Sequence, residues 1–432
     1  PTPPTPPPAA NTAAPPPAHN APPADSRIST LDASDHALSL TLAQATSLGT
    51  VTIAAGDTVT IVDTGANIAG MTAVQIAALA ASGIDTIDAS DNVINLTAAQ
   101  ATSLGTVIIA AGDTVTIVDT GANIAAMSAA QIGALDASGI DAIDATNNAL
   151  ALTVAQLNAL GTVTLTAGDT VTLADTGANL GALTAVEIAA LAAAGVNTLD
   201  ATDDALSLSV AQYGALGTVT LTAGDAVTLA DTGANLGALT AVEIAALEGD
   251  GIDVIDASND ALTLNLAQVA ALGNVALTAA DSVTIADTGA NLGALTAVEI
   301  AALAASGIDA IDASNNTLAL TVAQLNALGT VTLTAGDTVT LADTGANIGA
   351  LTAVEIAALA GDGIDVIDAS NDALALTITQ LNALGAVTLT AGDVVTLSDT
   401  GANLGALTPA AIGALAAAGV DVIDASDDAL SL

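Results

Sequence analysis

The sequence predicts an α/β solenoid, in which short coils of strand and helix stack on one another. Three observations predict this fold. The tetrapeptide Leu-Asp-Ala-Ser at Leu31 recurs every 56 residues without insertion or deletion, with Ile in place of Leu in most copies and Thr in place of Ser in two. Each interval alternates strand-like and helix-like segments. The apolar residues are mainly Ala, Val, Leu and Ile, interrupted every few positions by Thr, Asp or Gly, as expected for thin coils that bury a core by stacking.

The repeat divides the sequence into an array and a segment that precedes it. The 56-residue periods start at residues 31, 87, 143, 199, 255, 311 and 367, and a partial period starts at residue 423. We therefore expect one repeat solenoid over residues 28–432. Residues 1–27 hold eleven of the 12 prolines, spaced by Ala, Thr and Asn. This composition favours an extended polyproline II arm, which is either a linker or an arm that docks on a neighbouring molecule.

The period from Gly139 to Gly195 shows the expected elements in order. Residues 140–150 predict one strand-like stretch that includes a turn-forming Thr-Asn-Asn segment. Thr153 begins a Thr-x-x-Gln capping box that predicts a short helix ending at Gly161. Residues 162–167 and 170–174 alternate strictly around an Ala-Gly-Asp turn and predict two short strands. Residues 175–179 (Asp-Thr-Gly-Ala-Asn) form a loop or helix entry, and a second capped helix follows over 184–195.

Each period thus contains two strand–helix coils of 22 and 34 residues, counted from glycine to glycine. The first coil resembles the leucine-rich repeat, because Ile84, Ile87, Ala89, Asn92 and Ile94 match its L-x-x-L-x-L-x-x-N-x-L pattern, and residues 308–318 match again. Ala takes the place of the third leucine, and several periods have Asp in the Asn position. The resemblance implies stacked parallel strands with helices on the other side.

Charge and composition exclude several classes of function. The chain has one basic residue, Arg27, against 45 acidic residues, which gives a formal net charge of −44. A single basic residue cannot neutralise the phosphates of a nucleic acid, so we expect no binding to nucleic acid. The mean hydropathy is +0.69, but no run of about 18 apolar residues exists, so we expect no insertion into a membrane. Cysteine is absent and both histidines, His19 and His36, precede the second period, so we do not expect an enzyme.

Residues 28–432 repeat two sequence motifs, Ala-Asp-Thr-Gly-Ala-Asn and Ile-Asp-Ala-Ser-Asn-Asp-Ala-Leu, with small variations. In these motifs and in its overall composition the chain resembles the giant Ala-, Thr- and Asp-rich repeat proteins of Gram-negative bacteria. Those proteins are often exported by type I secretion and are described as adhesins, surface-layer-like proteins or calcium-binding proteins. The resemblance implies a bacterial protein that is extracellular or bound to the cell surface.

Acidic and amide side chains recur in three rows. One row begins and ends the Asp-Thr-Gly-Ala-Asn motif, a second lies in the turn between the strands of the longer coil (Asp57, Asp113, Asp169 and their equivalents), and a third follows the Ile of Ile-Asp-Ala-Ser (Asp88, Asp144, Asp200 and their equivalents). Carboxylate and amide oxygens suit calcium. The alternative is that these side chains cap helices, fill turns and bond the backbone of the neighbouring coil. The candidate calcium ligands are Asp63, Asn67, Asp119, Asn123, Asp175, Asn179, Asp231, Asn235, Asp287, Asn291, Asp343, Asn347, Asp399 and Asn403.

Other rows and single residues have structural interpretations. A Thr-x-Thr-x-Thr run at Thr162, repeated near Thr218 and Thr330, would suit an ice-binding surface, although threonine is also a good strand residue. Capping explains the glutamates that recur at Glu187, Glu243, Glu299 and Glu355. Tyr213, Met71 and Met127 occupy core-like helical positions, and His36 falls in the register of Asn92.

The leading functional prediction is an extracellular structural protein that forms a filament, a surface layer or an adhesin stalk. The last coil, Val420–Leu432, nearly copies Ile28–Leu40 and stops before its helix. Such ends predict head-to-tail stacking of identical chains through these two coils, with the Pro-rich arm bridging subunits. The alternative is a calcium-binding secreted module of a large adhesin, and an ice-binding protein is a third.

Overall fold

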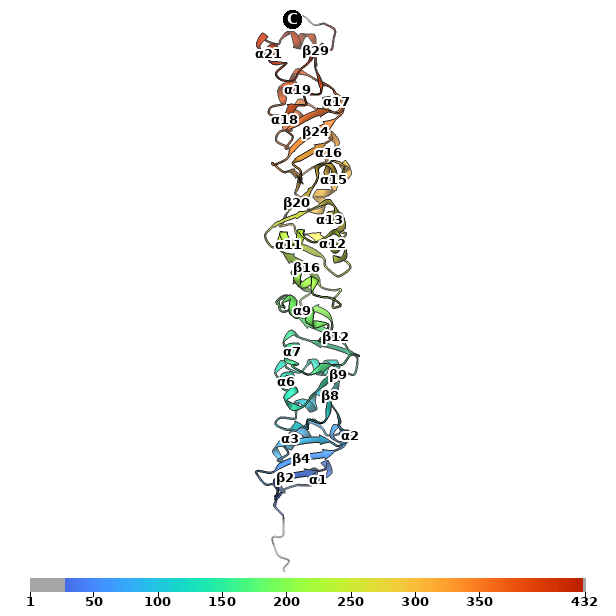
Figure 1. The fold of residues 1–432 in the computed structure, drawn as a ribbon, viewed down its shortest axis with the longest axis vertical. Coiled ribbons are helices and arrows are strands. Elements are labelled where there is room, and N and C mark those ends of the chain that lie inside the picture. The colour runs from blue at the N-terminus through green and yellow to red at the C-terminus, as the bar shows by residue number, and fades with distance from the viewer. Residues whose placement is uncertain (1–27, 430–432) are drawn as a thin grey trace, which may run out of the picture. The chain divides into compact units, whose positions relative to one another are not determined.

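The computed structural model describes residues 28–429 of the chain. Within these residues the chain divides into two compact units, 28–148 with 159–168 and 149–158 with 169–429. Every complete period repeats the same order of elements in both units (Figure 1). We call residues 84–105 and their equivalents the short coil, and residues 106–139 and their equivalents the long coil.

Each short coil contains two strands and one helix. The first strands are β1 (Thr30–Leu31), β5 (Thr86–Ala89), β9 (Ala142–Ala145), β13 (Val196–Ala201), β17 (Val254–Ala257), β21 (Ala310–Ala313), β25 (Val366–Ala369) and β29 (Val422–Ala425). The second strands are β2 (Ala37–Leu40), β6 (Val93–Leu96), β10 (Ala149–Leu152), β14 (Ala205–Leu208), β18 (Ala261–Leu264), β22 (Thr317–Leu320) and β26 (Ala373–Leu376). The helices are α1 (Leu42–Thr46), α4 (Ala98–Thr102), α7 (Val154–Ala159), α10 (Val210–Gly214), α13 (Leu266–Ala271), α16 (Val322–Ala327) and α19 (Ile378–Ala383).

Each long coil contains a two-residue strand, a six-residue strand and two helices. The short strands are β3 (Thr52–Ile53), β7 (Ile108–Ile109), β11 (Thr164–Leu165), β15 (Thr220–Leu221), β19 (Ala276–Leu277), β23 (Thr332–Leu333) and β27 (Thr388–Leu389). The longer strands are β4 (Thr58–Asp63), β8 (Thr114–Asp119), β12 (Thr170–Asp175), β16 (Ala226–Asp231), β20 (Ser282–Asp287), β24 (Thr338–Asp343) and β28 (Val394–Asp399).

The two helices of the long coil follow its longer strand. The first are α2 (Gly65–Ala69), α5 (Gly121–Ala125), α8 (Gly177–Gly181), α11 (Gly233–Gly237), α14 (Gly289–Gly293), α17 (Gly345–Gly349) and α20 (Gly401–Gly405). The second are α3 (Ala73–Ala81), α6 (Ala129–Gly133), α9 (Ala185–Leu191), α12 (Ala241–Leu247), α15 (Ala297–Leu303), α18 (Ala353–Ala358) and α21 (Pro409–Ala414). Two 3-10 turns, Asp136–Ser138 and Ala304–Ser306, extend the second helix in their coils.

All paired strands run parallel, and each sheet combines strands from successive coils. In the sheet β6-β8-β9-β11, residues 114–117 of β8 pair with 93–96 of β6, and residues 116–119 pair with 142–145 of β9. The six-residue strand therefore joins the coil before it to the coil after it. The two strands of one coil lie in different sheets, because a sharp corner separates them. This arrangement confirms the predicted α/β solenoid of stacked coils.

Alternate residues of each strand form the core of the stack. Leu96, Ile117 and Ile143 align across three strands, and each is at most 1% exposed. The intervening residues, such as Asn95 and Thr116, point away from this core. Because the side chains alternate with a period of two, the strict alternation in the sequence fixes which face is buried. The core is aliphatic, in keeping with a sequence that has no Phe or Trp.

Corners and close approaches explain the recurring polar and glycine residues. Asn92 has a φ of 58°, so an Asn, Asp or His that tolerates the left-handed conformation stands at each corner between the strands of a short coil. Gly65 begins α2, and a Cβ atom on it would lie 1.7 Å from the carbonyl oxygen of Val93 in the next coil. The glycine of Asp-Thr-Gly-Ala-Asn is therefore required by contact between coils rather than by a turn.

The observed elements match those predicted for the period from Gly139 to Gly195 in kind and order, although the strand predicted over 162–167 is only two residues long, and two further points differ. The first strand-like stretch consists of two strands, β9 and β10, because the Thr-Asn-Asn turn is the corner between sheets. The predicted loop or helix entry at 175–179 is a separate helix, α8, whose N-cap is Thr176. Among residues 28–429, no helix is long and apolar enough to cross a membrane. The predicted arm, residues 1–27, lies outside the described residues, as does the end of the last coil, 430–432.

Candidate functional site

The Asp and Asn of the Asp-Thr-Gly-Ala-Asn motif bond to each other. The Oδ1 atom of Asp63 accepts hydrogen bonds from the Asn67 side chain at 2.6 Å and from the Thr64 backbone N–H at 2.9 Å. Its Oδ2 atom accepts a bond of 3.1 Å from the backbone N–H of Leu42, at the start of α1 in the preceding short coil. One carboxylate therefore orders its own loop and caps the helix of the adjoining coil.

The same arrangement recurs at every candidate calcium position. The Asp–Asn bond is 2.6 or 2.7 Å long in each of the pairs Asp119–Asn123, Asp175–Asn179, Asp231–Asn235, Asp287–Asn291, Asp343–Asn347 and Asp399–Asn403. Each aspartate also accepts a backbone N–H from the first residue of the adjoining short-coil helix.

These bonds change the acidity of the row. In Asp63 the bond from Asn67 is the largest influence, and with the backbone bonds it lowers the pKa. In Asp343 partial burial acts to raise the pKa, but the bonds from Asn347, Thr344 and Val322 together outweigh it and lower the pKa. The carboxylates are therefore ionised and engaged by N–H donors at neutral pH.

The row thus shows the contacts of the alternative interpretation, in which the acids cap helices and bond the next coil. Each aspartate directs both oxygens toward N–H groups of the protein. Within residues 28–429, no three His, Cys, Asp or Glu side chains form a group that could hold a metal ion. Calcium binding by these Asp–Asn pairs stays a prediction.

The second acidic row lies in the turns before the six-residue strands and is more deeply buried. Asp113 is 9% exposed, and its Oδ2 atom accepts the backbone N–H of Ala89 at 2.9 Å. Its Oδ1 atom has no hydrogen-bond partner, and the same is true of Asp281, Asp337 and Asp393. Burial raises the pKa of Asp113, and the nearby charges of Asp88 and Asp91 add to this effect. The pKa values of Asp225, Asp281 and Asp393 are raised in the same way.

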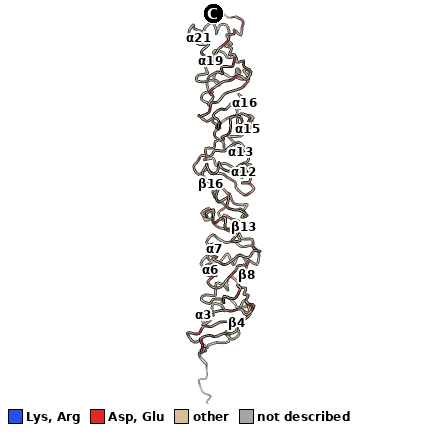
Figure 2. Tube along the Cα trace, in the orientation of Figure 1, with Lys and Arg blue, Asp and Glu red and all other residues tan. Residues whose placement is uncertain are grey.

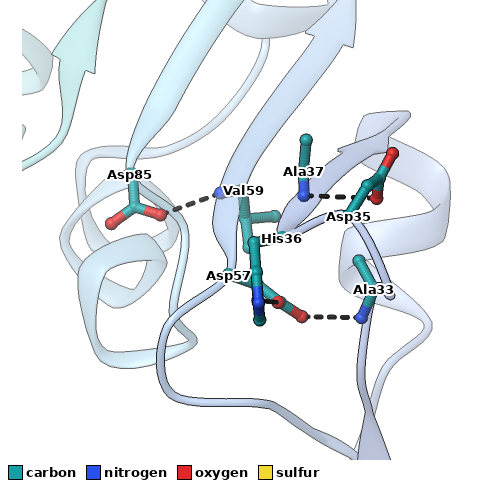
Figure 3. A network of polar contacts seen from close by, with 7 residues as sticks. All are labelled: Ala33, Asp35, His36, Ala37, Asp57, Val59 and Asp85. Carbon is teal, nitrogen blue, oxygen red and sulfur yellow. Dashed lines mark hydrogen bonds and ion pairs between the residues drawn. The ribbon is translucent and has the colours of Figure 1, made fainter.

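The first member of this row has a different partner. Asp57 accepts the Ala33 backbone N–H at 2.8 Å through Oδ2, and its Oδ1 atom lies 3.2 Å from Nδ1 of His36 (Figure 3). His36 has a φ of 57° and occupies the corner that Asn92 occupies in the next period, which confirms its predicted register. Where a later period has Asn at this corner, the Asn instead donates to a backbone oxygen, as Asn92 does to Gly112 at 3.0 Å.

The third acidic row, which follows the Ile of Ile-Asp-Ala-Ser, lies on the outer side of the first strands. Asp88 and its equivalents are partly exposed. In one period Asp144 accepts a hydrogen bond of 2.9 Å from the hydroxyl of Thr166. Figure 2 shows acidic residues in every period, and none of the residues 28–429 is Lys or Arg.

Sequence reasoning missed the role of a row of glutamines. Gln100 was expected to complete a capping box, and its Oε1 atom does accept the Thr97 N–H at 2.7 Å. Its Nε2 atom also donates to the carbonyl oxygens of Ala69 and Met71 in the preceding long coil, at 2.8 and 2.5 Å. Gln212, Gln268, Gln324 and Gln380 make the equivalent pairs of bonds. The signal was present, because short-coil helices always carry Gln here and never Glu, which has no N–H to donate.

The remaining predictions have mixed outcomes. Glu187 completes a capping box with Thr184, as predicted, and these bonds lower its pKa. Met71 and Met127 are each 4% exposed and lie in the core, as predicted. Tyr213 lies in helix α10, as predicted, but its side chain is only partly buried, and its hydroxyl donates to Asp250 at 2.6 Å.

The threonines of the Thr-x-Thr-x-Thr run use their hydroxyls within the protein. The hydroxyl of Thr162 donates to Asp136, and that of Thr164 donates to the carbonyl oxygen of Asp141 at 3.2 Å. The run therefore joins coils through side-chain bonds as well as through strand pairing.

Comparisons with known proteins identify no family for this chain. No protein-family model matches it, and no curated protein is similar to it in sequence. Among solved structures it is similar to one described as the crystal structure of a TDR receptor, with 12% sequence identity and a TM-score of 0.16. That similarity covers 82% of this chain and 65% of the other.

Proposed function

We propose that the chain is a structural repeat protein that acts outside the bacterial cell, as a stalk, a surface layer or a filament. One observation carries this proposal. The polar positions that recur with the period, and that were the candidates for a site, bond mainly to the backbone of the adjoining coil. The Asp–Asn pairs, the buried aspartates and the glutamines all join one coil to the next. A protein whose recurring polar side chains hold its own coils together is suited to form a long element that bears load.

Two further side-chain positions strengthen this interpretation. The Oδ2 atom of Asp85 accepts the backbone N–H of Val59 at 2.8 Å, and Asp91 accepts the N–H of Gly65 at 2.8 Å. Both bonds run from one coil to the next and recur in the later periods. Each junction is therefore held by several side chains in addition to the strand pairing.

Identical chains would associate head to tail in the proposed filament. The support is that, among the described residues, no coil precedes the first short coil. Its apolar side chains Leu42 and Leu48 are partly exposed, whereas their equivalents in the second short coil are buried. An open face on one copy that fits a coil of another gives a heterologous contact, which propagates when it does not close into a ring.

Sedimentation and electron microscopy test the filament. The purified chain is compared over a wide range of protein concentration, with and without calcium. We expect assemblies that grow with concentration and appear as filaments or sheets. Monomers alone under every condition would contradict self-assembly, and would leave the stalk as the form of the proposal to test.

A calcium-binding secreted module is the second candidate function. Two observations favour it: the acidic charge has no counter-charge in the array, and several buried carboxylate oxygens have no hydrogen-bond partner. Divalent cations would screen the repulsion among the coils. The test is the melting temperature by circular dichroism in calcium, in magnesium and in chelator. A rise that is specific to calcium supports the module, and identical curves in all three remove it.

A further inference from the structure

Two turns of the array each hold a buried carboxylate oxygen that has no hydrogen-bond partner. Asp281 and Asp393 directly precede β20 and β28, and each is 6% exposed. Their Oδ2 atoms accept the backbone N–H groups of Ala257 and Ala369, both at 2.8 Å. Their Oδ1 atoms are buried and accept nothing. A dry carboxylate oxygen without a donor costs free energy, so each turn lacks one hydrogen-bond donor.

The residue at the adjoining corner determines whether that donor is supplied. In the first period the corner residue is His36, and its Nδ1 atom lies 3.2 Å from Oδ1 of Asp57, which is the equivalent oxygen (Figure 3). In the period of Asp281 the corner residue is Asp260. An ionised carboxylate accepts hydrogen bonds but has no proton to donate, so this corner supplies a donor only after it takes up a proton.

The corner aspartates can reach the same place as His36. The backbone has nearly the same conformation at these corners, with a φ of 57° at His36, 54° at Asp260 and 53° at Asp372. The Nδ1 atom of His and the carboxyl oxygens of Asp are each three bonds from Cα. The side-chain orientation of His36 would therefore place an oxygen of Asp260 beside Oδ1 of Asp281. The side chain of Asp260 is exposed and makes no hydrogen bond to any of residues 28–429.

The surroundings of Asp281 are negatively charged. Burial is the largest cause that raises its pKa, and the charges of Asp256 on β17 and of Asp260 add to it. Equivalent causes act on Asp393. Asp309 of the following coil accepts the backbone N–H of the second residue of β20, at 2.8 Å. None of residues 28–429 is Lys or Arg, so no side chain of the array offers a permanent positive charge to these carboxylates.

A proton suits this position better than a metal ion. No three His, Cys, Asp or Glu side chains in the described part of the chain are grouped so that they could hold a metal ion. The orphan oxygen is also buried, and a proton needs neither a coordination sphere nor added volume. Two neighbouring carboxylates readily hold one proton between them, because the ionisation of both at close range is unfavourable.

We propose that Asp281 with Asp260, and Asp393 with Asp372, each bind one proton from solvent and share it between the two carboxyl groups. The O–H of one residue then donates to the oxygen of the other, in the place that Nδ1 of His36 holds in the first period. The pair loses one of its two negative charges. Because the corner belongs to a short coil and the turn to the following long coil, the shared proton adds a bond between coils. This site does not depend on the proposed filament.

The junctions that carry these pairs should become more stable in mild acid. The folded pair holds its proton at a higher pH than the carboxyl groups of the unfolded chain, whose pKa is about 4. Local stability therefore rises as the pH falls from the raised pKa of the pair towards this value. The Asp–Asn pairs have lowered pKa values, as at Asp343, and lose their contribution only in stronger acid. The two acidic rows thus respond to different ranges of pH.

Infrared difference spectroscopy detects the shared proton. The C=O stretch of a protonated carboxyl group is resolved from the bands of a carboxylate. The wild-type chain is compared with the double variant Asp260→Asn/Asp372→Asn at about pH 5.5, where an ordinary aspartate is ionised. We expect the wild type to hold about two more protonated carboxyl groups per chain, one for each pair. Equal bands in the two proteins would overturn the proposal.

A matched double variant separates proton sharing from simple charge repulsion. Asp256→Asn/Asp368→Asn removes the same number of charges near the same two oxygens but keeps both corner carboxyl groups. We expect this variant to keep at least half of the band. If both double variants lose the band equally, repulsion alone sets the protonation. If calcium removes the band from the wild type, a cation is the ligand. Either result overturns the proposal.

Local hydrogen exchange tests whether the proton strengthens the junction. Exchange of the Ala257 amide, which donates to Asp281, is compared between wild type and Asp260→Asn at the same pH, so the intrinsic exchange rate cancels. We expect the ratio of protection in wild type to that in the variant to rise at least fivefold from about pH 7.5 to about pH 5. The Ala313 amide donates to Asp337 beside an Asn corner, and its ratio should not change. A constant ratio at Ala257 would overturn the proposal.

A histidine at the corner tests the geometry at neutral pH. Asp260→His copies the contact between His36 and Asp57 and supplies the missing donor without acid. We expect the Ala257 amide to exchange at least three times more slowly in this variant than in wild type at about pH 7.5. Exchange that is equal or faster would show that the corner side chain does not reach the buried oxygen, and would overturn the proposal.

Discussion

Replacing one glutamine should measure how much the hydrogen bonds between coils contribute to stability, apart from those within a coil. Gln380 is 7% exposed and makes four bonds. Its Oε1 atom accepts from the backbone and hydroxyl of Thr377, at 2.7 and 2.8 Å. Its Nε2 atom donates to the carbonyl oxygens of Gly349 and Leu351, at 2.9 and 2.6 Å. Gln44 has the same capping box without the two bonds to carbonyls, so it is the matched control.

The magnitudes follow from these two sets of bonds. Gln44→Ala removes the return half of a capping box, which is worth about 1 kcal/mol. Gln380→Ala removes the same half and also leaves two carbonyl groups without their donor. Each lost bond costs about 1 kcal/mol, and more where the carbonyl stays dry. We expect about 3 kcal/mol at Gln380, and therefore an excess of about 2 kcal/mol over the control.

Local hydrogen exchange is the appropriate assay, because a long repeat array does not unfold in one two-state step. An excess of about 2 kcal/mol corresponds to exchange that is roughly thirty times faster at the Gln380 junction than the control substitution causes at its own helix. Equal acceleration in the two variants would refute the reasoning, since it would show that the bonds to carbonyls add nothing to the stability of a junction.

Four further measurements test other features. Gly289→Ala should destabilise its junction by more than about 3 kcal/mol, because the new Cβ would lie 1.7 Å from a backbone oxygen of the next coil. The control Gly214→Ala should stabilise its helix by up to about 1 kcal/mol, because its Cβ meets nothing within 4 Å. Local hydrogen exchange measures both effects. Asp343→Asn should lower the free energy of unfolding by about 1 kcal/mol at pH 7. A lowered pKa in the folded protein gives stability that is present above the unfolded pKa of about 4 and is lost in acid, so the difference should disappear as the pH falls through the pKa of Asp343. Denaturation of variant and wild type as a function of pH measures this difference. Desolvation and Asp250 raise the pKa of Tyr213, so its phenol should ionise above pH 10 and Asp250→Asn should lower that pKa; ultraviolet titration of this single tyrosine measures it. If the Asp–Asn pairs bind calcium, Asp343→Asn should also reduce the calcium-specific rise in melting temperature, and a rise that is equal in variant and wild type would place the ion elsewhere.

The sequence alone predicted the stacked coils because three kinds of signal agree at the same positions. The alternation around Ile117 indicates a strand, the capping box at Thr153 indicates a helix, and the glycine that follows ends it. The period then requires that each element meets its own copy. The two strands of the short coil were not separated, because the corner at Asn148 needs one residue of positive φ, which sequence alternation does not reveal.

The functional residues were harder to predict because their partners lie in other coils. A capping box links residues three apart, so Gln380 and Thr377 are visible as a pair in the sequence. The acceptors at Gly349 and Leu351 are about thirty residues away and are backbone atoms, which leave no mark on residue type. The partial exposure of Tyr213 was missed for a similar reason. Helical spacing indicates the face of the helix on which a residue lies, but not that Asp250 lies close enough to accept a hydrogen bond from its hydroxyl.

The uniformity of the junctions has a consequence for the gene as well as for the protein. When each period meets its neighbours through the same bonds, two misaligned copies of the coding sequence can exchange segments and change the number of periods without creating a new kind of contact. Such an exchange leaves the corners, caps and glycines in register. Natural variants of this protein are therefore expected to differ in length by whole periods, and selection can adjust reach without first solving a new folding problem.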